Sequence, residues 1–235
     1  MSRVYWHESL PSTMTEASRL AAEGAAHGTV IAAMQQTAGQ GRQGRQWLST
    51  AGDGLYCTFI LRFDVSAADL PCVTLGLGLA VVEALAPLLQ SPLDIRWPND
   101  ILCQGNKLCG ILARLEHGAV LAGIGVNLNQ TSFPAGLRTP ATSLHMLEGR
   151  TFTPQEVLEL LRAPVSRCMQ PGREGILRLF AQASSYVSGR RVCVDLDGSM
   201  LEGVTDGLDE FGFLRIRKVD GTRETVYAGS VRPAD

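Results

Sequence analysis

The chain contains 235 residues, of which 45% are hydrophobic, so it can bury a sizeable core as one main domain with a small appendage. A formal net charge of −2 excludes a general electrostatic attraction to nucleic acid, and any phosphate binding must therefore be local. Six cysteines without C-x-x-C spacing and the lack of an apolar signal segment argue against disulfides, zinc and secretion, which predicts a soluble cytoplasmic protein without a membrane partner.

Residues 1–63 are predicted to contain one helix and three short strands. The helix is expected from Thr13 to Glu23, and either Ser12 or Thr13 is its N-cap. A hydroxyl at either position could equally contact a ligand. The β-rich runs that predict the strands are residues 4–7, 29–35 and 54–63.

The middle of the chain is predicted to combine a buried helix with further strands of one central sheet. Residues 74–89 are apolar almost all round, and Pro87 should kink or end the helix that they form. Trp97 to Asp100 has the composition of a turn. Strands are expected over residues 93–96, 107–116 and 119–129, with a tight turn at residues 117–118 between the last two.

The last third of the chain changes from helical to strand-like spacing. Residues 155–169 and 174–186 predict helices that cover the sheet, with interruptions at Pro164 and at residues 171–172. From Arg191 the pattern indicates hairpins, with turns at residues 197–198, 211–212 and 220–221. This tail is either an independent barrel or an edge extension of the main sheet. We place the boundary near Ser188, which divides the chain into residues 1–188 and 189–235.

The most distinctive segment runs from Gln35 to Trp47. It joins three glycines (Gly39, Gly41 and Gly44), two arginines and an indole, and it contains no carboxylate. Main-chain N–H groups, fixed positive charges and a flat ring suit an anionic, aromatic ligand such as a nucleotide, although a glycine-rich loop can also be an ordinary turn. The spacing does not fit a dinucleotide fingerprint, because polar loop follows it instead of a helix, and the chain has no P-loop sequence.

Glycines and one lysine on the predicted strands could also bind a ligand. Lys107 begins an otherwise apolar strand, where a lysine either extends toward solvent or holds an anion. Gly110 either leaves room for a ligand against the sheet or marks a bulge. Gly123 and Gly125 either leave room for a flat ring or allow close packing in the core.

Four motifs, in this order along the chain, resemble those of biotin protein ligases. The resemblance covers nearly the whole chain and implies an α+β fold, with a mixed central sheet flanked by helices and a small C-terminal β-barrel of the Src-homology-3 type. It implies that ATP and Mg²⁺ activate biotin to biotinyl-5'-AMP, and that biotin then passes to a specific lysine of a biotin carboxyl carrier protein at the same site. The motifs are residues 35–47, 96–100, 107–112 and 123–129.

The resemblance also implies which residues bind biotin. Gln36 matches the glutamine that reads the ureido group, and Lys107 matches the lysine that contacts the biotin carboxylate and the α-phosphate. Two residues depart from the family pattern, because Met14 replaces an asparagine and Gln40 replaces the first arginine of the loop. The biotin-binding residues implied are Ser12, Thr13, Met14, Gln36, Gly39, Gln40, Gly41, Arg42, Lys107, Gly110, Gly123 and Gly125.

The nucleotide and catalytic residues follow from the same resemblance. Arg42 and Arg45 would hold phosphates, and Trp47 would pack beneath the adenine. Asp100 would orient the incoming lysine amine or organise metal and water. The ATP-binding residues implied are Arg42, Arg45, Trp47, Asn99, Lys107 and Asn127, and the catalytic residues are Lys107, Arg42 and Asp100; no metal ligands are assigned.

Two other functions stay open at this point. A lipoate-type ligase or acyltransferase has the same fold but lacks the glycine–arginine loop as a family pattern. A biotin-sensing protein that represses transcription would carry a DNA-binding domain, and only eleven residues precede Ser12, so we expect a monofunctional ligase without a DNA partner. The sequence leaves open whether the chain forms a homodimer.

Overall fold

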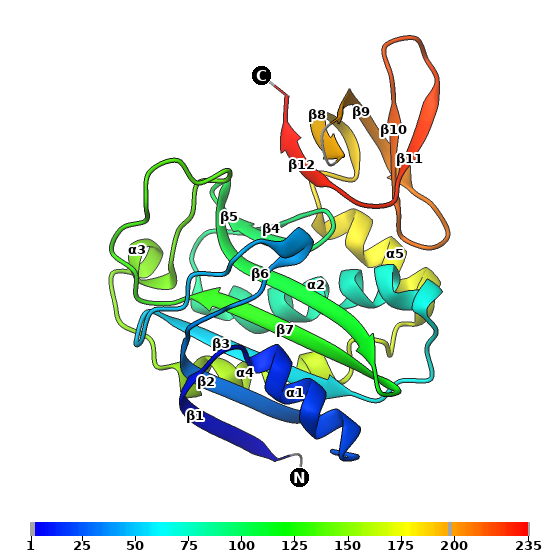
Figure 1. Ribbon diagram of the computed structural model, residues 1–235. Helices are drawn as coiled ribbons and strands as arrows, with labels where there is room; N and C mark the ends of the chain where they lie inside the picture. The colour runs from blue at the N-terminus through cyan, green and yellow to red at the C-terminus, as the bar shows by residue number, and fades with distance from the viewer. Residues whose placement is uncertain (1–2, 197–198, 235) are drawn as a thin grey trace.

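A seven-stranded sheet forms the centre of the fold in the computed structural model, which describes residues 3–196 and 199–234 (Figure 1). The strand order is β1-β2-β3-β7-β6-β5-β4. β1 and β2 are parallel and the other neighbours are antiparallel, so the sheet is mixed, as expected. The strands are β1 (Val4–Leu10), β2 (Thr29–Gln36), β3 (Gly54–Leu61), β4 (Leu93–Arg96), β5 (Asp100–Cys103), β6 (Asn106–Glu116) and β7 (Ala119–Asn127).

Two-residue turns join the strands that carry most of the motifs. His117 and Gly118 have φ values of 50° and 65° and connect β6 to β7. Gln104 and Gly105, with φ values of 51° and 78°, connect β5 to β6 in the same way. Positive φ at both central residues matches the right-handed twist of the flanking strands. These two turns hold three consecutive strands in register.

The helices cover both faces of the sheet. α1 (Thr13–Ala22) begins at the N-cap Ser12, whose side chain accepts a hydrogen bond from the Met14 N–H, and it packs on the face that carries Ile31. Val30 and Ala32 point to the opposite face, because side chains alternate along a strand. That face is covered by α2 (Leu70–Leu85), α4 (Pro154–Ser166) and α5 (Gly172–Ala183).

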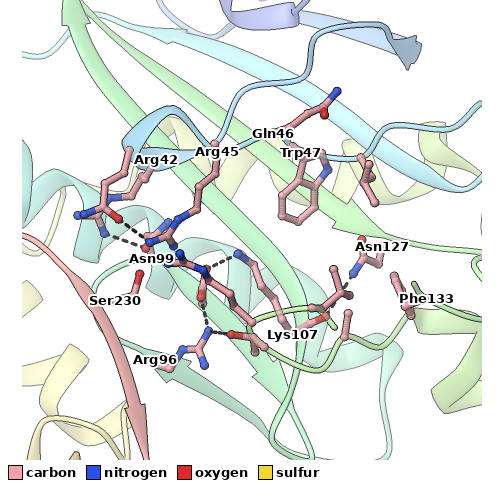
Figure 2. Close-up of a pocket in the computed structure, with 18 of the residues that line it drawn as sticks. Arg42, Arg45, Gln46, Trp47, Arg96, Asn99, Lys107, Asn127, Phe133 and Ser230 are labelled. Carbon is pink, nitrogen blue, oxygen red and sulfur yellow. Dashed lines mark hydrogen bonds and ion pairs between the residues drawn. The ribbon is translucent and has the colours of Figure 1, made fainter. Parts of the chain in front are cut away.

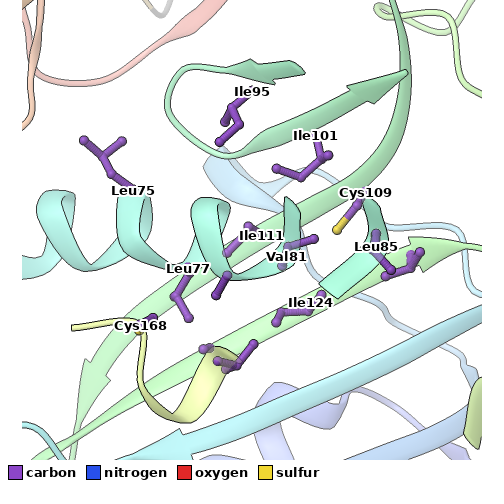
Figure 3. Packing of buried hydrophobic residues seen from close by; sticks show 14 of the residues in the cluster. Leu75, Leu77, Val81, Leu85, Ile95, Ile101, Cys109, Ile111, Ile124 and Cys168 are labelled. Atoms are coloured by element: carbon purple, nitrogen blue, oxygen red, sulfur yellow. The ribbon is translucent and has the colours of Figure 1, made fainter. Parts of the chain in front are cut away.

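α2 is the central helix of the core. Figure 3 shows Leu77, Val81 and Leu85 of this helix lying against Ile111 and Ile124 of the sheet. The helix ends at Leu85, and Pro87 lies in the short 3₁₀ turn that follows, at residues 86–88. Pro87 therefore ends the helix, as predicted.

The structure differs from the predicted helices at two places. Pro164 does not interrupt its helix: it removes a single N–H donor in the last turn of α4, and the helix continues to Ser166. A short helix, α3 (Leu144–Glu148), was not predicted; Ser143 caps it by accepting a hydrogen bond from the Met146 N–H.

One helical stretch, Ala67–Leu88, is long and apolar enough to cross a membrane by length and composition alone. More than half of its most apolar window, 56%, is buried inside the protein, against the sheet and against α4 and α5. A core helix meets the same criteria of length and hydropathy, so this stretch is scaffold.

The C-terminal part forms a separate five-stranded antiparallel sheet, seen at the upper right of Figure 1 beyond α5. Its order is β11-β10-β9-β8-β12, and within the described residues the two outer strands do not pair, so the sheet is not closed into a full barrel. The predicted turns at residues 211–212 and 220–221 are present, and the one at residues 197–198 lies outside the described residues. The strands are β8 (Ser188–Leu196), β9 (Ser199–Leu208), β10 (Leu214–Arg217), β11 (Arg223–Val226) and β12 (Ser230–Pro233).

Candidate active site

A cavity of about 430 Å³ opens where the glycine–arginine loop, the β4–β5 turn and the C-terminal sheet meet. Figure 2 shows Arg42, Arg96, Asn99 and Lys107 gathered in it, with Trp47 beside them. We call this space the open half of the site. Its walls are residues 41–43, 45–48, 96–100, 137–139 and 229–232, with several single residues between them.

A second cavity, the narrow half, lies between the first turn of α1, the end of β2 and the glycines of β6 and β7. It shares Gly41, Arg42, Trp47, Asn99 and Lys107 with the open half, so the two cavities lie on either side of a common wall. Its volume is about 60 Å³, well below the roughly 300 Å³ at which ligand pockets begin. Side chains of the protein itself therefore fill much of this half.

Trp47 fills the space above two of the predicted glycines. A Cβ atom on Gly110 would lie 2.7 Å from the ring atom Cζ3, and one on Gly125 would lie 2.5 Å from Cε2. The indole Nε1 is buried and has no hydrogen-bond partner among the described residues. The flat ring expected against these strands is, in this structure, the chain's own tryptophan, and a ligand that uses the same space must displace it.

Met14 covers the third glycine. A Cβ atom on Gly123 would lie 2.9 Å from the Met14 sulfur, and Met14 is buried in the small core cluster beneath α1. An asparagine would lose this apolar packing, which gives the departure from the family pattern a structural reason. Gln40, the other departure, donates from Nε2 to Thr15 Oγ1 at 3.4 Å, while its buried Oε1 has no partner in the described part of the chain.

The glycine–arginine loop is folded back on itself. The Gly41 N–H donates to the Arg45 carbonyl at 2.7 Å, and the Trp47 N–H donates to the Gly39 carbonyl at 2.9 Å. A Cβ atom on Gly39 would lie 2.4 Å from the Trp47 carbonyl oxygen. Gly39 is therefore required for the fold of the loop, and it lines neither cavity.

Asp100 lies between two cations on the wall of the open half. Its Oδ2 accepts from Arg96 at 2.5 Å and its Oδ1 lies 2.6 Å from Lys107 Nζ. Burial raises the pKa of Asp100, but the charges and hydrogen bonds of Lys107 and Arg96 outweigh burial, so the pKa lies below its ordinary value. Asp100 is therefore a fixed carboxylate that holds Lys107 in place. Arg96 also donates to Thr139 Oγ1 at 2.8 Å.

Arg42 carries a partly desolvated charge. Its guanidinium donates to Asn99 Oδ1 at 3.0 Å, and Asn99 in turn donates to the Ile111 carbonyl at 2.7 Å. Burial lowers the pKa of Arg42, an effect that the charge of Asp100 opposes. Among the described residues Arg42 has no carboxylate within ion-pair distance, so the position favours an anionic ligand. Arg45 is exposed and donates to the Gln43 side chain.

Asn127 holds the main chain around Lys107. Its Nδ2 donates to the Lys107 carbonyl at 3.2 Å and to the Thr142 carbonyl at 3.0 Å. The Lys107 N–H donates to the Pro140 carbonyl at 2.8 Å. Both amide hydrogens of Asn127 are therefore in use, and any contact from this side chain to a nucleotide would come from Oδ1.

Sequence reasoning missed two segments of the wall. Residues 132–141 contain no recognisable motif, and residues 229–232 come from the C-terminal sheet. Arg138 of the first segment donates to Asp195 of β8 at 3.2 Å, and Arg232 lies 3.7 Å from the same oxygen. No local pattern signals these residues, because tertiary packing alone brings them to the cavity. The predicted residues other than Gly39 all line one half or both.

Comparisons with known proteins agree with this arrangement. Residues 6–130 match the biotin/lipoate A/B protein ligase family, and residues 187–232 match the biotin protein ligase C-terminal domain. A biotin–[acetyl-CoA-carboxylase] ligase of Mycobacterium tuberculosis is 36% identical over 94% of this chain and 85% of its own length. The bifunctional ligase/repressor BirA of Bacillus subtilis is 32% identical over 96% of this chain and 72% of its own.

A solved structure extends the similarity to the whole fold. The biotin protein ligase from Aquifex aeolicus in complex with biotin and ATP superposes with a TM-score of 0.83 at 30% identity, over 100% of both chains. Sequence match and fold thus coincide over both parts of the molecule. The chain belongs to the biotin/lipoate A/B protein ligase family.

Proposed function

We propose that this site binds biotin and ATP, forms biotinyl-5'-AMP, and transfers biotin to a lysine of a biotin carboxyl carrier protein. The chain is an ATP-dependent biotin protein ligase. The observation that carries the proposal is the wall that the two halves share, which contains Lys107 and Arg42, so that a carboxylate from one side and a phosphate from the other would meet two cations. The fold and the relatives' names support the same reaction.

We assign biotin to the narrow half and ATP to the open half. Gln36 and Thr13 would face the polar ring of biotin, and Trp47 would leave the floor of the narrow half and pack against the adenine. Arg42 and Arg45 would hold phosphates. The unpartnered Trp47 Nε1 and the small free volume support a ring that moves when the ligand binds.

Two covalent steps then follow at one place. A carboxylate oxygen of biotin bonds to the α-phosphorus, the bond from that phosphorus to the pyrophosphate oxygen breaks, and pyrophosphate leaves. Next, a neutral lysine amine of the carrier bonds to the acyl carbon, AMP leaves with the bridging oxygen, and the amine gives up a proton. Lys107 stabilises negative charge in both steps, and Asp100 keeps Lys107 in position.

Mg²⁺ would enter with the phosphates of ATP. Within the described residues no group of three His, Cys, Asp or Glu side chains could hold a metal ion. Asp53 and Asp100 are carboxylates on the cavity wall, and both oxygens of Asp100 are already paired with cations. This donor set fits an ion held mainly by phosphate and water, which neutralises charge on the triphosphate.

We also propose that residues 1–188 form the catalytic domain and residues 189–235 a small C-terminal domain. The family match beginning at residue 187 and the start of β8 at Ser188 support this division. Residues 229–232 then give the second domain a direct place in the site.

Biotin-dependent exchange of labelled pyrophosphate into ATP tests the first step with purified protein. We expect exchange with biotin and none without it, and mass spectrometry of an added carrier domain should show one biotinyl amide. Exchange supported by lipoate and not by biotin would replace the proposal with a lipoate-type ligase.

A further inference from the structure

The side-chain amide of Gln36 is held in one orientation. The Thr13 N–H lies 2.8 Å from one end of the amide, and a main-chain N–H can only donate, so this end must be the oxygen Oε1. The Thr13 hydroxyl donates to the same oxygen at 3.1 Å. The amide nitrogen Nε2 therefore faces the other way, toward Ser49 Oγ at 2.9 Å.

Ser49 connects this amide to the glycine–arginine loop. Because Nε2 can only donate, the Ser49 hydroxyl accepts from it and keeps its own hydrogen for the Trp47 carbonyl, 3.2 Å away. A main-chain hydrogen bond from the Gln36 N–H to the Ser49 carbonyl, 3.2 Å long, adds a second link. Ser49 is only 7% exposed, so water does not readily replace its hydroxyl.

The atoms around the Ser49 hydroxyl are closely packed, and their hydrogen bonds fix its orientation. A Cβ atom on Gly39 would lie 2.9 Å from Ser49 Oγ and 3.1 Å from Gln36 Nε2. On the far side of the amide, the Thr13 hydroxyl, which donates to Gln36, lies 2.9 Å from the Thr58 hydroxyl, which must then be the donor of that pair. The directions of all these hydrogen bonds are fixed by one another, from Thr58 to the Trp47 carbonyl.

We propose that Ser49 is a positioning residue that acts through Gln36 and couples the orientation of its amide to the folded position of the loop. The inference rests on the proposed function, in which Gln36 contacts biotin. An amide donates at one end and accepts at the other, so its orientation decides which ligand atoms it can satisfy. Without the Ser49 hydroxyl, Nε2 loses the partner that holds it, whereas the main-chain hydrogen bond from the Gln36 N–H to the Ser49 carbonyl still holds the loop.

If Ser49 only kept the loop folded, the loss of its hydroxyl would affect ligand binding differently. Trp47 and Arg42 belong to the wall shared by both halves, so a general loss of loop order would weaken biotin and ATP together. A role through Gln36 would weaken biotin alone. The effect of Ser49→Ala on biotin would also disappear in a variant that lacks the Gln36 side chain.

The test is a double-mutant cycle with Ser49→Ala and Gln36→Ala in the full chain, read as the KM values for biotin and ATP in pyrophosphate exchange. We expect Ser49→Ala to raise the KM for biotin about tenfold, the loss of one ordinary hydrogen bond, and the KM for ATP less than twofold. In the Gln36→Ala background the same change should alter the KM for biotin less than twofold.

A matched control is Ser184→Ala. Ser184 is 6% exposed, donates to the Ile95 carbonyl and accepts from the Tyr186 N–H, but it lines neither cavity. This variant should lose stability without a change in either KM. Should Ser49→Ala fail to fold, Ser49→Cys enters the same cycle, because a thiol keeps the shape and weakens the hydrogen bond.

Equal effects on the two KM values, or the same factor with and without Gln36, would overturn the role of Ser49 while leaving the ligase activity in place. Lack of biotin-dependent exchange in the unmodified protein would instead overturn the function on which the inference rests. The two failures are therefore distinguishable in one set of assays.

Discussion

The narrow half of the site is built mainly by strands and the first turn of α1, with the glycine–arginine loop along one side, whereas the open half is built mainly by loops and by the C-terminal sheet. In the narrow half, Gln36 and Thr13 form hydrogen bonds whose directions are fixed, and glycines set the depth of the floor. In the open half, Arg138 and Arg232 reach Asp195 through partly exposed ion pairs. We therefore expect the change of a single atom in the narrow half to alter ligand binding strongly, and the loss of a single contact in the open half to alter it little.

The largest effect is expected where the halves meet. Lys107→Ala should reduce biotin-dependent pyrophosphate exchange by at least about 100-fold, because under the proposed function the charge that develops at the reacting phosphate would lose the Lys107 cation, a cost of roughly 3 kcal/mol in the barrier. Lys218→Ala is the control, since the other lysine of the chain pairs with Glu224 outside the cavity. Near-normal exchange in folded Lys107→Ala would remove Lys107 from the chemistry.

A single added methyl group tests the rigidity of the narrow half. Gly125→Ala should raise the KM for biotin at least about tenfold, because its Cβ would lie 2.5 Å from the Trp47 ring or in the place of a ligand. Gly78→Ala is the matched control, since its Cβ would meet only ordinary contacts at 3.6 Å in the core. If Gly125→Ala bound biotin normally, the floor of the narrow half would be deformable and the contrast between the halves would fail.

The open half should tolerate the loss of its link to the C-terminal sheet. Asp195→Ala should raise the KM for ATP no more than about threefold and leave the KM for biotin unchanged, since exposed ion pairs contribute about 0.5 kcal/mol. Asp206→Ala, which breaks the pair with Arg223 in the same sheet, should change neither value. Steady-state kinetics with ATP as the varied substrate measure these KM values. A tenfold rise in the KM for ATP in Asp195→Ala would show that the ion pairs of Asp195 contribute directly to ATP binding.

The smallest effect concerns pH. The folded-state pKa of Asp100 lies below its unfolded value, so its contribution to the free energy of unfolding is complete above the unfolded pKa, about 4, and is lost as pH falls through the folded pKa. The difference in unfolding free energy between the wild type and Asp100→Asn should stay constant from pH 8 to about pH 5 and shrink below pH 4. Urea titrations at several pH values measure it, and a dependence between pH 5 and 8 would contradict the pairing.

The same contrast explains how much could be predicted from the sequence. β6, β7 and the glycine–arginine loop carry recognisable motifs, so the resemblance to a family could single out Lys107, Gly110 and Trp47 as candidate site residues, although the local pattern around Lys107 and Gly110 also allowed a purely structural role. β5 follows directly on the predicted turn, and its four residues show no alternation of apolar and polar side chains, so it was not predicted. Thr139 and the residues of β12 reach the cavity through packing between distant parts of the chain, which no local pattern encodes.

The positions of the two lysines also bear on whether the reactive acyl-adenylate can acylate the enzyme itself. The chain contains only Lys107 and Lys218. Lys107 is paired with Asp100, and the hydrogen bond and charge of Glu224 raise the pKa of Lys218, so that amine is protonated near neutral pH and is not a nucleophile. An acyl-adenylate made here would therefore meet few unprotonated lysine amines on the molecule that produces it, and we expect little self-modification.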